Sequence, residues 1–338
     1  MATEMIKPND DIFKYYLYFA QERMNIFWNK YEENYPLTQD LTLQTYKFTN
    51  VYRAMDRVSQ YLIRNVIYSD DNFSNKDVLL RIIVFKIFNK PETWEYLESE
   101  VGKISIDNFN LKHINKALLK RKESGPIFNN AYMMTGTHSL YNHLDFKHEK
   151  WLQMVKDELI GQSVIDKIID ANSLSDAFDY LRGCSFIGDF LAYQYAIDMN
   201  YSTVINFSED SFVKAGIGAI RGIKKCFGNA SSARYSNEDI IRFTQENFEY
   251  YQKKFDFNEF KPLFGRAPTL IDIQNCFCET DKILRVKMPE LQVQNKRIKQ
   301  QYKETPKPLE LFFPPKWNIN QNIDKPCLPA TTRELTLF

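Results

Sequence analysis

Apolar residues recur at helical spacing along most of the chain. In the first such segment, from Asp11 to about Glu33, they fall three or four positions apart, without the strict alternation of a strand. Similar patterns predict helices over about 44–68, 76–89, 107–121, 147–159, 162–171, 173–183, 236–254 and 269–287, and Pro91 is suited to open one more. The pattern therefore predicts an all-α fold.

The helical pattern decays after Pro289. Six prolines follow between residues 306 and 329, and proline cannot occupy a helix interior. Apolar residues such as Phe313 and Trp317 continue through the same stretch. We therefore expect residues 291–338 to form an extended C-terminal arm that is docked on the helical body.

Composition narrows the class of protein. The chain has 338 residues, 44% of them hydrophobic, but only 11 glycines, which argues against Gly-rich phosphate loops, β-propellers and doubly wound nucleotide folds. Lys and Arg (44) balance Asp and Glu (43), so binding to nucleic acid would depend on local patches. The odd number of cysteines (five), the absence of a signal pattern and the lack of an apolar run of about 18 residues predict a reduced, cytoplasmic protein without a membrane span.

A first candidate for chemistry is the segment from Asn50 to Tyr61. On one continuous helix Arg53, Asp56, Arg57 and Gln60 would share a face. That face is either a solvated surface with Arg–Asp pairs or the wall of a cleft for a phosphate or a base.

A second candidate is Asn89, just before Pro91. Its amide is suited to cap the next helix or to contact a base edge with two hydrogen bonds.

A third candidate is a helix–turn–helix stretch around Ser185 and Gly188. One helix is expected to end at Gly183 and another to begin near Asp189, so that the turn presents backbone N–H groups to a phosphate. Asp210 follows 22 residues after Gly188. On the residues alone, an ordinary turn followed by a surface acid is the preferred interpretation.

A fourth candidate is the cluster of Gly216, Gly218 and Gly222. Three glycines in so short a span predict a close backbone approach, either to another helix or to a phosphate with Arg221, Lys224 and Lys225 adding charge. No strand precedes the cluster, so it is not a dinucleotide fingerprint.

The third and fourth stretches together resemble the helix-hairpin-helix DNA glycosylases, with residues 184–188 as the hairpin and Asp210 as the catalytic aspartate. More of the chain, about residues 45–290, resembles one branch. It is the family of α-glutamyl/putrescinyl thymine pyrophosphorylases and of the helical domain of hydroxymethyluracil DNA kinases, some of whose relatives are phage-defence glycosylases. The matching stretches are Tyr52 to Arg57, Phe88 to Trp94, Ala131-Tyr132, Gly216 to Gly218 and Cys278 to Lys282.

The resemblance implies a two-lobed, glycosylase-like domain over residues 1–290, with one lobe at about 45–205 and the other at 1–44 plus 206–290. It also implies a monomeric, monofunctional DNA glycosylase without cofactor or metal, which excises a hypermodified pyrimidine from double-stranded phage DNA as anti-phage defence. Glucosylated hydroxymethylcytosine is the first expected substrate. Asp210, with Glu209 as its rival, would stabilise the oxocarbenium-like sugar. Further implied roles are a base pocket of Tyr52, Arg53, Asp56, Arg57, Asn89 and Tyr132, and DNA binding by Ser185, Gly188, Gly216, Gly218, Arg221 and Lys224.

Departures from the glycosylase pattern keep two alternatives open. The hairpin retains only Gly188, and Phe190 stands where bifunctional glycosylases have a lysine nucleophile. The first alternative is a transferase or pyrophosphorylase acting on hydroxymethyluracil-derived bases in DNA, and the second is a non-catalytic DNA-binding module. Because no P-loop pattern occurs in the printed sequence, kinase activity is not expected of it.

Overall fold

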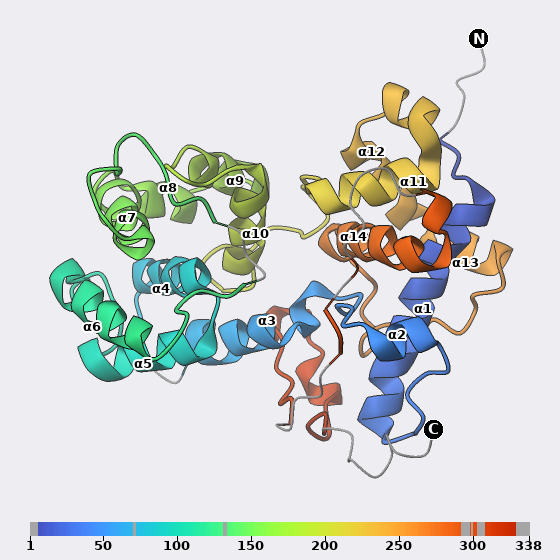
Figure 1. Cartoon of the computed structure of the whole chain (residues 1–338), viewed down its shortest axis with the longest axis horizontal. Coiled ribbons are helices and arrows are strands. Elements are labelled where there is room, and N and C mark those ends of the chain that lie inside the picture. Colours follow the sequence, from blue (N-terminus) through green and yellow to red (C-terminus); the bar gives the residue numbers. More distant parts are fainter. Residues whose placement is uncertain are drawn as a thin grey trace. The chain divides into compact units, whose positions relative to one another are not determined.

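The computed structural model describes residues 6–69, 72–130, 134–291, 298, 300–302 and 308–328, with the backbone alone for 229–233. Within these residues the structure is helical, with three isolated β-bridges and no strand, so the all-α prediction is confirmed (Figure 1). The chain divides into two compact units. Unit 1 comprises Met1–Arg57 and Val213–Phe338, and unit 2 comprises Val58–Phe212.

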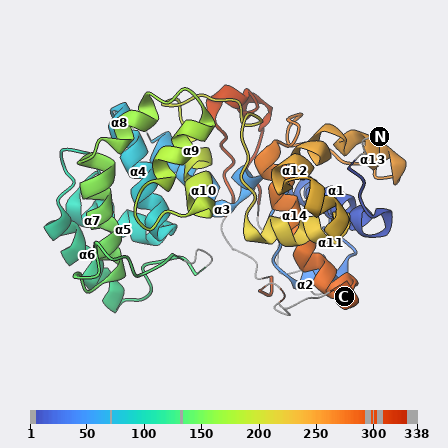
Figure 2. The same cartoon turned by 90° about the horizontal axis from the view of Figure 1, so that it is seen from above.

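Unit 1 is built around one buried helix near its carboxyl end. Its elements are α1 (Asp10–Glu32), α2 (Leu41–Thr45), η1 (Arg53–Met55), α11 (Ile217–Arg234), α12 (Asn237–Glu246), α13 (Phe248–Lys254), α14 (Leu270–Lys287), η4 (Pro289–Leu291), η5 (Pro315–Trp317) and η6 (Asn320–Asn322). Helix α14 packs against α1, α11 and α12, and Figures 1 and 2 both show α11 beside it. Thr269 and Asp272 form a capping box that fixes where α14 begins.

The core of unit 2 is a helix that is buried on nearly every side. The elements of the unit are α3 (Arg57–Tyr61, which starts at the unit boundary), η2 (Leu62–Ile67), α4 (Asn75–Phe88), α5 (Pro91–Val101), α6 (Leu111–Glu123), α7 (Lys147–Met154), η3 (Val155–Ile160), α8 (Val164–Ile169), α9 (Leu174–Arg182) and α10 (Asp189–Asn200). All residues of α4 from Leu79 to Phe88 are buried, and this helix packs against α5, α8 and α10. A helix that is buried all round occupies the centre of a domain.

Two of the predicted helices differ from the structure. The segment 44–68 is not one helix, because it contains α2, η1, α3 and the π-helical η2, and Asp56 has an extended backbone (φ −62°, ψ 137°). The predicted helix 236–254 is divided at Asn247 into α12 and α13. Helix α11 was not predicted, because it contains three glycines, Gly218, Gly222 and Gly228, which obscure the helical pattern.

Residues 308–328 of the C-terminal arm pack on the helical part of unit 1. Phe313 is fully buried and lies against Phe264, while the guanidinium of Arg266 lies 3.9 Å from the centre of the Trp317 ring. Leu309 and Cys327 exchange two backbone hydrogen bonds, which close this stretch into a loop. Residues 292–297, which include the basic Lys296, lie outside the described residues.

Candidate functional site

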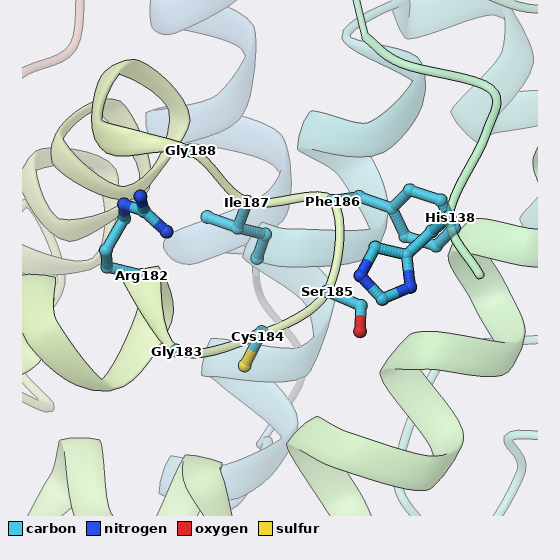
Figure 3. A pocket seen from close by; sticks show the side chains of 8 residues that line it. All are labelled: His138, Arg182, Gly183, Cys184, Ser185, Phe186, Ile187 and Gly188. Atoms are coloured by element: carbon cyan, nitrogen blue, oxygen red, sulfur yellow. The ribbon is translucent and has the colours of Figure 1, made fainter. Parts of the chain in front are cut away.

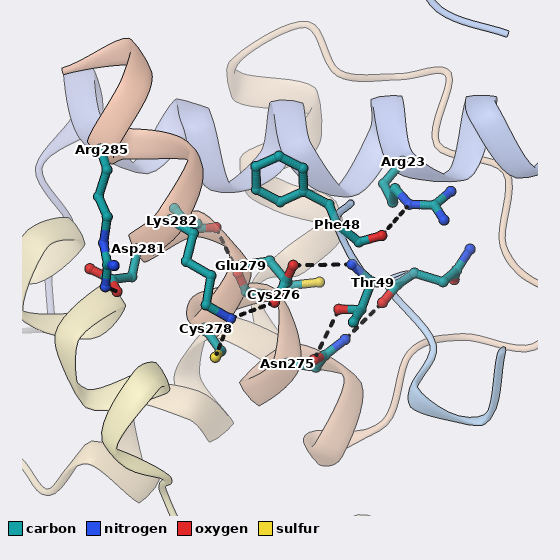
Figure 4. Close-up of polar contacts among 12 residues, drawn as sticks. Arg23, Phe48, Thr49, Asn275, Cys276, Cys278, Glu279, Asp281, Lys282 and Arg285 are labelled. Atoms are coloured by element: carbon teal, nitrogen blue, oxygen red, sulfur yellow. Dashed lines mark hydrogen bonds and ion pairs between the residues drawn. The ribbon is translucent and has the colours of Figure 1, made fainter. Parts of the chain in front are cut away.

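The polar side of α14 holds the segment that precedes η1. Asn275 donates from Nδ2 to the carbonyl oxygen of Asn50 (2.7 Å), and the N–H of Thr49 donates to Oε2 of Glu279 (3.1 Å; Figure 4). The N–H of Arg53 donates to Oδ1 of Asp272 (2.8 Å). Segment 49–53 is therefore fixed by side chains of one helix.

Tyr52 is a core residue of unit 1. Its ring is 1% exposed, its hydroxyl donates to the carbonyl oxygen of Arg266, and it accepts from the N–H of Leu263 (3.2 Å). Burial raises the pKa of the Tyr52 hydroxyl, so the group stays protonated. The hydroxyl of Tyr52 therefore holds the turn 263–266, and the expected place of Tyr52 in a base pocket stays a prediction.

Of the four residues predicted to share one helix face, only Arg57 and Gln60 lie in the same helix, α3. Arg53 lies in η1, Asp56 is the extended residue after it, and Arg57 is the first residue of α3. The spacing argument required an unbroken helix, and the extended backbone at Asp56 removes it. A contact of these three side chains with a base or phosphate stays a prediction.

The glycine cluster makes its close approach to α14. The N–H of Gly216 donates to Oε1 of Gln274 (3.2 Å). A Cβ added at Gly218 would lie 2.4 Å from Sγ of Cys278, and one added at Gly222 would lie 2.0 Å from the carbonyl oxygen of Phe277. Of the two alternatives that the sequence left open, the described contacts therefore support close helix packing, and the backbone phosphate site predicted at Gly216 and Gly218 is occupied by α14.

Of the cationic side chains Arg221, Lys224 and Lys225 in α11, one is largely buried in an ion pair and two lie on the surface. Lys225 pairs with Asp281 (2.9 Å), which also pairs with Arg285 (2.5 Å), and both acceptor oxygens are almost fully buried. Arg221 and Lys224 are exposed. DNA contact stays a prediction for Arg221 and Lys224.

In unit 2, the turn between α9 and α10 lines a cavity of about 360 Å³ that is wide open to solvent. Its lining comes from the turn itself, residues 183–188, together with Arg182 and His138 (Figure 3). Gly188 is the N-cap of α10, and a Cβ added there would meet nothing within 4 Å. The first backbone N–H groups of α10 have no acceptor within the helix, which makes this end suited to an anion.

The buried side chain of Glu158 anchors the turn. Its Oε2 accepts the N–H of Ser185 (2.7 Å) and its Oε1 accepts the hydroxyl of Tyr141 (2.7 Å), while the side chain is only 6% exposed. The backbone N–H of Ser185 therefore points into the protein and is not available to a phosphate, and DNA contact through the rest of Ser185 stays a prediction. Nothing in the local sequence identified Glu158, because it lies 27 residues before Ser185.

Aromatic packing fixes the conformation of Phe186. Its φ of +67° is rare for a bulky residue, and its ring stacks on Trp151 at 5.1 Å and contacts His138 and Tyr141. Burial raises the pKa of the nearby Cys184 thiol to about 12, so this sulfur lines the cavity as a neutral group. The turn is a rigid support whose polar groups are Arg182 and His138.

Arg182 and His138 give the cavity its polar edge. The guanidinium of Arg182 pairs with Asp189, and both side chains are 52% exposed, so the pair contributes little to stability and can exchange for another anion. The buried Nδ1 of His138 has no hydrogen-bond partner among the described residues. Neither residue was predicted, although Arg182 directly precedes the turn.

Asn89 ends helix α4 rather than capping α5. It is the C-cap in the left-handed conformation (φ 49°), its carbonyl oxygen accepts from Asn129, and Lys90 is the N-cap of α5. The Asn89 side chain is 4% exposed, and its Oδ1 has no hydrogen-bond partner among the described residues. One turn earlier, the buried Lys86 lies 3.3 Å from Asp198 of α10. A buried acceptor without a donor beside a buried ion pair is unusual, and such groups concentrate at functional sites.

The two candidate carboxylates differ in exposure. Asp210 is exposed in a turn, where its N–H donates to Oγ of Ser208 (3.3 Å), whereas Glu209 is buried. A buried carboxylate at residue 210 was expected and is not present. Tyr132, the remaining base-pocket candidate, lies outside the described residues. In the described part of the chain no group of three or more His, Cys, Asp or Glu side chains is arranged to hold a metal, and no helix is long and apolar enough to cross a membrane.

A buried histidine at the start of α7 makes stability depend on pH. His148 is 2% exposed, and burial lowers the pKa of its imidazole. Because the unfolded chain then binds the proton more tightly, the free energy of unfolding should fall as the pH drops below about 6.5, by at most about 1.4 kcal/mol per pH unit. Urea unfolding measured between pH 7.5 and 5.5 should show that the free energy of unfolding depends less steeply on pH in His148→Phe than in the parent protein. Exposed His113 is the control, and an equal change in His113→Gln would contradict the assignment.

Comparison with known proteins identifies the family. Residues 10–293 match the family described as the helical domain of 5-hmdU DNA kinase. The chain belongs to this family. It is also 28% identical over 251 residues to the 5-hmdU DNA kinase of Bacillus phage SP10, an alignment that covers 67% of the chain and 38% of that relative. No solved structure matches the chain.

These findings correct the predicted activity. Both comparisons name a kinase, which is a phosphotransferase, so the prediction of a DNA glycosylase and hydrolase is wrong. The branch of the resemblance that includes the hydroxymethyluracil DNA kinases is confirmed, while a glycosylase-like architecture is not shown. The absence of a P-loop pattern led us not to expect kinase activity. That expectation was too broad, because the matched family is the helical domain of a kinase.

Proposed function

We propose that this chain is the DNA-holding part of a transferase that acts on 5-hydroxymethyluracil in DNA, with a phosphoryl group as the group transferred. The observation that carries the proposal is the family match over residues 10–293. The matched kinase is much longer than the alignment, which covers 38% of it. We therefore assign to this chain the binding of the acceptor base, and assign it no nucleotide-binding role.

The chemistry of the acceptor defines what the site must recognise. 5-Hydroxymethyluracil differs from thymine by one hydroxyl, which can donate one hydrogen bond and accept others. Asn89 supports the proposal, because its buried Oδ1 lacks a donor among the described residues. The turn at Gly188, with Arg182 at its edge, supplies N–H groups and a cation for a backbone phosphate.

The expected result is selective binding of DNA that carries the free hydroxyl. Fluorescence anisotropy would compare one oligonucleotide carrying thymine, 5-hydroxymethyluracil or 5-methoxymethyluracil at a single position. We expect about tenfold tighter binding of the 5-hydroxymethyluracil DNA than of either other DNA, the value of roughly one net hydrogen bond. Equal affinities, or a preference for the methyl ether, would overturn the proposal.

Asn89→Asp tests the residue itself. It keeps the side-chain size and tolerates the left-handed backbone, but it replaces the amide by a carboxyl group. We expect the preference for the hydroxyl to change in this variant. Asn318→Asp is the matched control, because Asn318 is also left-handed (φ 53°) but is exposed in unit 1. An unchanged preference in Asn89→Asp would remove Asn89 from the proposal.

A further inference from the structure

We propose that helix α6 is a second DNA-contacting surface, which binds the phosphate backbone without reading the base. Unit 2 carries 16 Lys and Arg against 21 Asp and Glu, so it is acidic as a whole. Helix α6 departs from this balance, with five basic residues against Glu123 alone. The inference rests on the proposed function only in taking DNA as the partner.

The basic residues of α6 form a stripe that faces away from the core. Lys112, Lys116 and Lys120 recur every four residues and are exposed. Ile114, Ala117 and Leu118 form the buried face of the same helix. Helix α6 packs against α5 and α7, and the first turn of α7 adds Lys147 and Lys150. The stripe is therefore presented on a fixed scaffold.

The charges of the stripe are poorly neutralised. Among the described residues Lys112 and Lys116 form no ion pair, and Lys120 forms a long one with Glu100 (3.7 Å). Like charges four residues apart destabilise a helix by about 0.2–0.5 kcal/mol per pair. A solvated surface helix normally mixes charges of both signs, so an unneutralised stripe indicates a polyanionic partner.

The spacing of the stripe suits a nucleic-acid strand. Four residues of helix rise about 6 Å, so the three lysines span about 12 Å. A DNA strand presents one phosphate per roughly 3.4 Å of its axis, which places about three phosphates within reach. Each neutralised phosphate contributes about −0.9 to the slope of log Kobs against log salt.

The test is the salt dependence of DNA binding in a triple variant, Lys112→Gln, Lys116→Gln and Lys120→Gln. Between 50 and 200 mM NaCl we expect a slope shallower by about 2.7 and roughly 100-fold weaker binding near 150 mM. The weakening should be equal for thymine and 5-hydroxymethyluracil DNA. Thermal unfolding should not shift downward, because glutamine is a good helix former and the like charges are removed.

A second triple variant in unit 1 is the matched control. Lys253, Lys254 and Lys261 are each paired with a carboxylate at 2.6–2.8 Å, so Lys→Gln at these three positions removes the same charge. An equal loss of slope in both variants, or none in the α6 variant, would overturn the α6 surface. Loss of binding to polyglutamate with DNA binding intact would overturn it in favour of an acidic protein partner. Loss of the thymine discrimination with the slope intact would instead count against the proposed function.

Discussion

Replacing Gly222 by alanine is expected to destabilise unit 1 by about 3 kcal/mol or more. The added Cβ would lie 2.0 Å from the carbonyl oxygen of Phe277 and 2.8 Å from its carbonyl carbon. These are backbone atoms of α14, and α14 is held in turn by Tyr16, whose hydroxyl donates to Ile273 (3.1 Å). Alanine normally favours a helix over glycine by about 1 kcal/mol, so a loss would come from the clash. Urea unfolding measures it, and a variant as stable as the parent would contradict the packing.

Gly218 provides the matched comparison, because its neighbour is a side chain. A Cβ there would meet Sγ of Cys278 at 2.4 Å, whereas the Cβ of Cys278 is 3.4 Å away. Gly218→Ala should therefore be destabilising alone and largely restored by Cys278→Ala. The same Cys278→Ala change should not restore Gly222→Ala, since the obstacle there is backbone. Restoration of both variants would mean that the two helices simply move apart.

For these glycines the sequence predicted the close approach but not the partner. Three of them in one short span predicted a close backbone approach, because only glycine brings two backbones so near. The partner was not predictable, since α14 begins 48 residues after Gly222 and no local pattern links them. In the sequence, a glycine cluster beside lysines looks the same whether it approaches a phosphate or another helix.

The prediction of one continuous helix from Asn50 to Tyr61 failed for a different reason. Its periodicity is helical, but the N–H of Arg53 is taken by Asp272, and the extended Asp56 interrupts the helix. Tertiary hydrogen bonds of this kind override a local propensity. The family resemblance placed Tyr52 in a base pocket, whereas in the structure its buried hydroxyl has backbone partners.

The turn between α9 and α10 was placed correctly because its signals are local. Gly183 and Gly188 bracket a short turn between two apolar helices, and the structure ends α9 at Arg182 and begins α10 at Asp189. Its support was not predictable, because Glu158 and Trp151 come from other elements. The activity assigned to the turn was wrong, since a helix–turn–helix support is not itself evidence of glycosidic chemistry.

Replacing Glu158 by alanine should have the second large effect. Two buried donors, the N–H of Ser185 and the hydroxyl of Tyr141, would lose their acceptors, each at about 1–3 kcal/mol. We expect unit 2 to lose about 2–4 kcal/mol of stability, measured by urea unfolding. The turn would also lose the anchor that helps to hold Phe186 in its rare conformation (φ 67°). Because the turn lines the cavity, its distortion should also lower the affinity for DNA.

Tyr141→Phe separates the anchor of the turn from the aromatic packing around it. This variant removes one donor to Glu158 and leaves the ring of Tyr141 against Phe186, 5.5 Å between centroids, while the Ser185 bond to Oε2 is kept. Its cost should be about 1 kcal/mol, with DNA affinity unchanged. Glu158→Gln should fall between the two, because its amide offers one acceptor oxygen to two donors. If Tyr141→Phe weakened DNA binding as much as Glu158→Ala, the bond to Ser185 would not be what maintains the cavity. The ordering Ala, Gln, Phe in both stability and affinity is expected only if Glu158 acts through the backbone of the turn.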